Sequence, residues 1–209
     1  MITNILAYID GRDSAENAAE TAFQLATRHN AHVNGLHVRA DVREFITNVP
    51  IYTGIESLTK FSDSFDRDAA QAEKHAIDIF MQVRDRHAAV DQQAAQPPVR
   101  PTANWTVIPG RADSVVSHRA RVSDVCVIGR ASYGRHNSRI SVIEAALFDS
   151  GRPVLIAPPH PPASVGRDIV ISWNRSAASA RALNSALPLL DKADRIRLIH
   201  VETGAKTGP

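Results

Sequence analysis

Residues 5–11 of the chain read ILAYIDG, a mainly apolar run of five residues followed by the turn pair Asp10-Gly11. An apolar run of this length that ends in turn residues predicts a buried β-strand. Ser14 can cap a helix over residues 15–29, in which alanine and leucine recur at helical spacing. A second apolar run predicts another strand over residues 31–38. Strand, helix and strand in this order predict a parallel β-α-β unit.

The same alternation continues as far as residue 157. We expect a surface excursion over residues 40–58 and loops over 91–101 and 130–139. The further predicted strands cover residues 105–108, 124–128 and 154–157, and the further predicted helices cover 63–87, 112–121 and 141–148. Five strands separated by helices predict an α/β fold with a five-stranded parallel sheet.

The opening pattern then returns. Residues 158–162 read PPHPP, a stiff linker that can neither continue a sheet nor enter a helix interior. IVISW (169–173), a helix at 177–191 and a strand at 196–201 follow it. Because strand, turn, helix and strand repeat in order, we expect a tandem repeat: a first domain over 1–160 and a partial second copy, a β-α-β fragment, over 161–209.

Residue matches support this duplication. At an offset of 164 residues Ile5 falls on Ile169 and Asp10 on Asn174, and at an offset of 163 His37 falls on His200. The two histidines therefore occupy equivalent strand ends, which indicates a shared structural role. A β-α-β fragment is too small to bury its own faces, so it must pack on the first domain or on a second chain.

Composition excludes several classes of protein. The chain has 24 basic and 22 acidic residues, and no cluster of Lys and Arg that would indicate a nucleic-acid partner. Its apolar runs are far shorter than the roughly 20 residues needed to cross a membrane, and its N-terminus does not resemble a secretion signal. Its single cysteine, Cys126, fits a reducing compartment, so we expect a cytoplasmic protein.

Three stretches carry a family resemblance. ILAYIDGRDSAENA (5–18), VCVIGR (125–130) with Ser141-x-x-Glu144 and GRPVLIAPP after it, and IVISWNRSAASARALNSALPLL (169–190) stand in the order typical of one family. The chain resembles the universal stress proteins, of the bacterial tandem type with a truncated second repeat. The resemblance implies a stress-response protein. Its fold would be a five-stranded parallel, doubly wound sheet of the Rossmann-like, nucleotide-binding class, with helices on both faces. It also implies a homodimer formed through the fifth strand, Val154–Ala157.

Some universal stress proteins bind ATP at the carboxyl edge of the sheet, between strands one and four. The resemblance carries that site onto Asp10, Gly11, Val38, Gly129, Arg130, Ser132 and Ser141. The ATP-binding members show Gly-x-x-Gly, nine residues, then Gly-Ser or Gly-Thr. Here Gly129 matches the first glycine, but Ser132 and Ile140 replace the other two, and the interval to Ser141 is two residues shorter. Since glycines let the backbone approach phosphate closely, we expect ATP binding to be weak or lost.

Several residues at this edge have two interpretations. The cations Arg130, Arg135, His136 and Arg139 form either a remodelled anion or nucleotide pocket, or a solvated polar loop, which is the commoner case. Asp10 either contacts a nucleoside, as the resemblance implies, or bonds its own turn. Val38 matches a position that meets adenine in the family, whereas a valine at a strand end belongs to the core by default.

No other constellation predicts chemistry. The nine histidines lack ligand partners at metal-binding spacing, and Cys126 lies inside an apolar strand, so we expect no metal site and an inert thiol. Ser117-His118 with Asp113 or Asp124 are triad residue types without a nucleophile elbow. The sequence therefore predicts a noncatalytic stress-response module acting as a homodimer, with no cofactor or with ATP or AMP. The alternatives are an ATP/AMP-binding stress sensor and a nucleotide-hydrolysing enzyme on the same fold.

Overall fold

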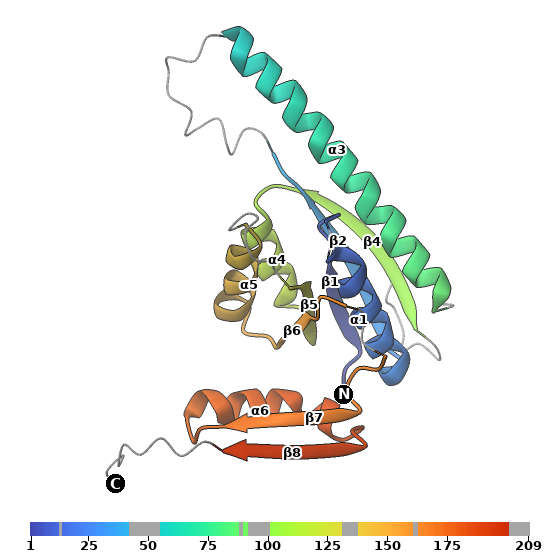
Figure 1. Cartoon of the computed structure of the whole chain (residues 1–209), viewed down its shortest axis with the longest axis vertical. Coiled ribbons are helices and arrows are strands. Elements are labelled where there is room, and N and C mark those ends of the chain that lie inside the picture. Colours follow the sequence, from blue (N-terminus) through green and yellow to red (C-terminus); the bar gives the residue numbers. More distant parts are fainter. Residues whose placement is uncertain are drawn as a thin grey trace. The chain divides into compact units, whose positions relative to one another are not determined.

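The computed structural model describes residues 1–12, 14–41, 55–87, 90–91, 101–130, 138–160 and 163–200. The chain divides into two compact units, Met1–Ala163 and Ser164–Pro209, and each is considered by itself. Figure 1 shows the elements of both units.

The first unit is built on one parallel sheet. Its strands are β1 (Asn4–Tyr8), β2 (His32–Arg39), β3 (Val90–Asp91), β4 (Thr102–Pro109), β5 (Val125–Gly129) and β6 (Val154–Ala157), in the spatial order β3-β4-β2-β1-β5-β6. Every pair of neighbouring strands is parallel. The five predicted strands and the doubly wound α/β fold are thereby confirmed, and the two-residue strand β3 extends the sheet at one edge.

Helices cover both faces of this sheet. On one face lie α1 (Ala15–His29) and α3 (Ile55–Arg86), and on the other lie α4 (Ala112–Ala120) and α5 (Ser138–Asp149) (Figure 1). Side chains alternate along β1 accordingly: Leu6 and Tyr8 pack in a buried cluster with Val116 of α4 and Val142 of α5. On the opposite face the Phe23 and Phe80 rings, from α1 and α3, meet at 5.3 Å between centroids.

Three element boundaries differ from the sequence predictions. α3 begins at Ile55 instead of residue 63, because its apolar spacing extends back through Phe65 and Phe61; residues 42–54 of the expected surface excursion lie outside the described residues. β3 occupies Val90–Asp91, at the start of the expected loop. α5 begins at Ser138, which moves Arg139 from the expected loop into the first turn of a helix.

Asp124 fastens the beginning of the chain to the start of β5. One oxygen of its carboxylate, Oδ2, accepts hydrogen bonds from the Thr3 amide (2.7 Å), the Thr3 hydroxyl (2.9 Å) and the Asn4 amide (3.0 Å). Burial by itself would raise the pKa of the Asp124 carboxyl. These hydrogen bonds and the charge of Arg152 outweigh burial and hold the pKa below its usual range.

The second unit is a β-α-β element. β7 (Asp168–Trp173) and β8 (Arg195–His200) pair in parallel, with α6 (Ala177–Leu190) between them in sequence, close to the bounds predicted for these elements. Asp168 lies opposite Arg195 in this pair, whereas Asn4 lies opposite His32 in the β1–β2 pair. The offsets of 164 and 163 residues found in the sequence relate these two pairs.

The turn after the first strand has the same form in both units. The Asp10 side chain accepts a hydrogen bond from the Arg12 amide at 3.1 Å, and the Asn174 side chain accepts one from the Ser176 amide at 3.1 Å. The intervening residues, Gly11 and Arg175, both have left-handed backbones, with φ of 73° and 63°. Glycine adopts this conformation without strain, whereas an arginine in it is strained.

The equivalent histidines also make equivalent contacts. The His37 ring donates from Nδ1 to the carbonyl of Ile9 at 2.9 Å, and the His200 ring donates to the carbonyl of Trp173 at 2.8 Å. In each unit this bond ties the end of the second strand to the end of the first. The structural role predicted for the two histidines is therefore confirmed.

Candidate functional site

The order of the strands reverses between β1 and β5. β1 pairs with β2 on one side and with β5 on the other, so the chain winds outward in both directions from this point. In doubly wound sheets ligands bind at the carboxyl ends of the two strands that flank such a switch point. Asp10 follows β1 and Gly129 ends β5, so two of the predicted site residues meet at this location.

An ion pair occupies the switch point. The Arg139 guanidinium, from the first turn of α5, donates from Nε to Asp10 Oδ2 at 2.7 Å and from Nη2 to Asp10 Oδ1 at 3.0 Å. Both side chains are largely withdrawn from solvent, with exposed fractions of 10% for Arg139 and 13% for Asp10. A bidentate pair of this kind is both strong and geometrically specific.

The same guanidinium reaches two further acceptors. Nη1 donates to the Ser14 hydroxyl at 2.5 Å and to the Arg130 carbonyl at 3.3 Å. Ser14 precedes α1, and its side chain makes no capping bond to that helix. Arg139 therefore joins the end of β1, the start of α1, the end of β5 and the start of α5.

Gly129 and Ser14 are in direct contact. A Cβ atom placed on Gly129 would lie 2.7 Å from the Ser14 carbonyl oxygen and 3.1 Å from its Cβ, and nearer still to its hydroxyl oxygen. Only a residue without a side chain fits this approach. Here the small residue accommodates a neighbouring serine of the protein. We call Asp10, Ser14, Gly129, Arg130 and Arg139 the tip cluster.

The tip cluster corrects one interpretation of the basic residues. For Arg139 the expectation of a solvated loop residue is wrong, because its guanidinium is buried and paired. Arg130 contributes its backbone to the cluster, and its side chain is exposed. Ser132, Arg135 and His136 lie outside the described residues. The sequence did contain a signal for this pairing. Asp10 and Arg139 carry opposite charges, and both follow strands that were predicted to end at the same edge of the sheet.

The other predicted site residues lie in different surroundings. Gly11 packs against α3, where a Cβ atom on it would lie 3.0 Å from the Ala72 carbonyl carbon. Val38 is buried in the cluster beneath α4 and α5, as its default interpretation requires. Ser141 lies on an exposed position of α5. The structure therefore brings together Asp10, Gly129 and Arg130, and it adds Ser14 and Arg139 to them.

Tyr8 is the last residue of β1, two residues before Asp10, and it is buried. Burial, with a further contribution from the Asp10 charge, raises the pKa of its hydroxyl well above the usual range, although Arg12 and Arg139 act in the opposite direction. The phenol therefore remains neutral at physiological pH and cannot supply a charge to a ligand there.

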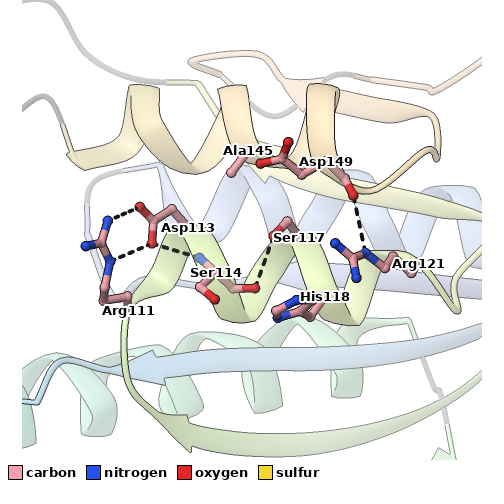
Figure 2. A pocket seen from close by; sticks show the side chains of 8 residues that line it. All are labelled: Arg111, Asp113, Ser114, Ser117, His118, Arg121, Ala145 and Asp149. Carbon is pink, nitrogen blue, oxygen red and sulfur yellow. Dashed lines mark hydrogen bonds and ion pairs between the residues drawn. The ribbon is translucent and has the colours of Figure 1, made fainter.

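Figure 2 shows a separate pocket between α4 and α5, which contains the triad residue types noted in the sequence. The Ser117 hydroxyl donates to the Ser114 carbonyl at 3.1 Å. The Asp113 carboxylate accepts a hydrogen bond at its Oδ2 atom from Nη2 of Arg111 at 2.7 Å. No bond joins Ser117 to His118 in Figure 2. With its serine and aspartate engaged elsewhere, this group is not arranged for nucleophilic catalysis.

Three further findings concern the residues that the structure describes. Cys126 is buried in β5, and burial raises the pKa of its thiol to about 12, as expected of an inert core cysteine. Within the described ranges there is no group of three or more His, Cys, Asp or Glu residues that could hold a metal ion. None of the helices described is both long enough and apolar enough to span a membrane.

Comparison with known proteins gives a consistent result. The model of the Universal stress protein family matches residues 1–116. Among solved structures, universal stress protein UspA from Lactobacillus plantarum has a TM-score of 0.53 and 19% identity, with 75% of this chain and 98% of that chain covered. A universal stress protein from Archaeoglobus fulgidus has a TM-score of 0.58 and 16% identity, with 97% of this chain and 67% of that chain covered. No curated protein matches the sequence.

Proposed function

Because the chain belongs to the universal stress protein family, we propose that it is a noncatalytic binding or regulatory module of the stress response, in which nucleotide affinity is weak or lost. The observation that carries this proposal is the tip cluster. Its acceptors are taken by Arg139, and Gly129 lies so close to Ser14 that no side chain would fit between them.

A nucleotide at this edge would need groups that the tip cluster has already engaged. Phosphate binds where backbone amides of a glycine-rich turn are free to approach it. Gly129 is in contact with Ser14, and Ser132 and Ile140 stand where the ATP-binding pattern has glycine. A nucleoside that contacts Asp10 would have to displace a buried bidentate arginine, which is costly because it leaves a charge unpaired.

Calorimetric titration of the whole protein with ATP, ADP and AMP, with and without Mg²⁺, tests this proposal. We expect dissociation constants of about 1 mM or weaker, near −4 kcal/mol, and no excess absorbance near 260 nm when the purified protein is denatured. A micromolar constant for ATP would instead establish the ATP or AMP sensor. Phosphate release that disappears in an Asp10→Ala variant would establish the nucleotide hydrolase.

We further propose that the protein acts as a homodimer through β6. Among the strands that the structure describes, β6 lies at the edge of the sheet and pairs with β5 alone. The carbonyls of Pro153 and Ala157 accept bonds from β5, so the alternation along a strand turns the backbone groups of Val154 and Ile156 toward the free edge. Ile156 is 43% exposed there. An unpaired edge with apolar side chains is suited to pairing with a second copy.

Light scattering at micromolar concentration tests the dimer. We expect twice the mass of the chain for the wild type, and the mass of one chain for Ile156→Lys, because a lysine on an edge strand opposes pairing. Val122→Lys is the matched control, since Val122 is an exposed valine in the turn between α4 and β5. A wild-type monomer, or an Ile156→Lys dimer of unchanged affinity, contradicts the proposal.

For the second unit we propose a partial second copy of the first domain, with the boundary between residues 160 and 161. The shared strand register, the shared turn with a left-handed residue and the paired histidine contacts support a common origin. A residue-by-residue match of this kind is what duplication would leave.

We also propose that the protein is located in the cytoplasm, on the basis of its single cysteine.

A further inference from the structure

Arg139 uses nearly all of its hydrogen-bonding capacity inside the protein. A guanidinium has five N–H donors, and the four bonds to Asp10, Ser14 and Arg130 engage Nε, Nη1 twice and Nη2 once. Its charge is balanced by the Asp10 carboxylate, and its side chain is 10% exposed. A cation satisfied in this way is not available to an incoming anion.

We propose that Arg139 is an internal competitor that occupies the switch point in place of a ligand, and that the Asp10–Arg139 pair keeps two opposite ligand sites masked. The inference rests on the proposed function, because it explains why nucleotide affinity is low. Asp10, once released, is an acceptor for hydroxyl groups. Arg139, once released, is a donor for phosphate.

The geometry of the pair explains which ligand each group would take. The two carboxylate oxygens of Asp10 receive two parallel N–H donors at 2.7 and 3.0 Å. A vicinal diol, such as that of a nucleoside ribose, also presents two adjacent donors and could replace the two N–H groups of Arg139. The two parallel N–H donors of the Arg139 guanidinium in turn match two oxygens of a phosphate as well as they match a carboxylate.

Separating Arg139 from Asp10 requires other contacts of the arginine to break as well. The Ser14 hydroxyl accepts a hydrogen bond from Nη1 at 2.5 Å, and Ser14 itself lies against Gly129. The arginine is therefore bounded by the start of α1 and the end of β5 as well as by Asp10. A ligand that bound the masked and unmasked states equally would not shift them. Only a ligand that replaces the bonds lost by Asp10 or by Arg139 can shift the population.

Two substitutions separate the two masked sites. Arg139→Gln removes the guanidinium and leaves the Asp10 carboxylate, so we expect adenosine, which has the diol and no phosphate, to bind at least tenfold tighter than to the wild type. Asp10→Asn removes the negative charge and frees the guanidinium, so we expect inorganic phosphate to bind at least tenfold tighter. Arg121→Gln is the matched control: its Nε donates to the Asp149 carbonyl at 3.2 Å, outside the tip cluster, and neither affinity should change.

The ratio of variant to wild type decides the inference, whereas the wild-type affinity decides the proposed function. The competitor role is overturned if the folded variants gain less than tenfold in affinity for these ligands. It is also overturned if Arg139→Gln gains affinity for phosphate and Asp10→Asn gains affinity for adenosine. Both results would hold even if wild-type binding is weak. Both variants are checked for a native circular dichroism spectrum, because each leaves one partner of a buried pair unmatched.

The wild type supplies a test that needs no variant. We expect the Arg139 Nε–H resonance to be resolved by NMR and protected from solvent exchange. An Arg139 Nε–H in fast exchange with solvent overturns the inference, whatever happens to the variants.

Discussion

The contact between Gly129 and Ser14 predicts that Gly129→Ala destabilises the first unit. The added Cβ would lie 2.7 Å from the Ser14 carbonyl oxygen. This is about 0.6 Å shorter than the closest ordinary carbon–oxygen contact of roughly 3.3 Å. Since the obstacle is backbone, it cannot rotate away, and either β5 or the start of α1 must shift. Overpacking of this kind costs about 1–3 kcal/mol.

A shift of Ser14 would also weaken its hydrogen bond to Arg139. We therefore expect a total loss of about 3 kcal/mol, at the upper end of the range for overpacking. In a domain of this size that loss lowers the Tm by roughly 6–12 °C, which thermal unfolding followed by circular dichroism would measure.

Gly151→Ala is the matched control for this substitution. Gly151 has a left-handed φ of 68°, but a Cβ on it meets nothing within 4 Å. It should therefore lose only about 1 kcal/mol, from backbone strain. If Gly129→Ala melts within about 2 °C of the wild type, the close approach of α1 to β5 is wrong. An equal loss in both variants would likewise show that the contact with Ser14 contributes nothing.

Gly11→Ala should cost more than about 2 kcal/mol in urea unfolding. It combines a left-handed φ of 73° with a Cβ that would lie 3.0 Å from the Ala72 carbonyl carbon and nearer still to the carbonyl oxygen; a loss equal to that of Gly151→Ala would show that the contact is absent. Arg175→Gly should slow amide exchange in β7 and β8 by stabilising the second unit about 0.5–1 kcal/mol, since glycine relieves strain at φ 63°; faster exchange would contradict this. Asp124→Asn should cost about 1–2 kcal/mol at pH 7. Because the folded pKa of Asp124 is lowered, its contribution is complete above the unfolded value near 3.9 and disappears as the pH falls through the folded value. The difference in stability between variant and wild type should therefore shrink steadily as the pH falls below about 3.9.

The sheet could be predicted from the sequence because its determinants are local. ILAYI and VCVIG are short apolar runs that end in turn residues, and parallel strands buried on both faces need little else. The start of α5 was harder to predict, because a residue in its first turn makes its contacts far away in the sequence. α5 begins three residues before the expected position, and its first turn carries the arginine that pairs with Asp10, 129 residues earlier in the chain.

The site was only partly predictable, for the same reason. Asp10 and Gly129 could be placed at the switch point, since both directly follow or end a predicted strand. The role of Ser14 could not be seen, because a serine before a helix predicts a cap, and here the hydroxyl accepts from Arg139 instead. Ser132 and Ile140, which stand in place of glycines, predict that the phosphate turn is lost, and this stays a prediction. They gave no indication of the ion pair between Asp10 and Arg139.

The two units together indicate which features belong to the fold and which to the site. Both have the turn that follows the first strand, with a side chain bonding the amide two residues on and a left-handed residue between. The second unit forms this turn with Asn174 and Arg175, so neither a charge nor a glycine is needed to build it. The carboxylate of Asp10 must then be explained by another interaction, and the described structure provides one in the buried pair with Arg139. On this basis an asparagine at position 10 should preserve the turn while releasing the arginine, which is why Asp10→Asn separates the site from the fold more cleanly than a substitution of Gly11.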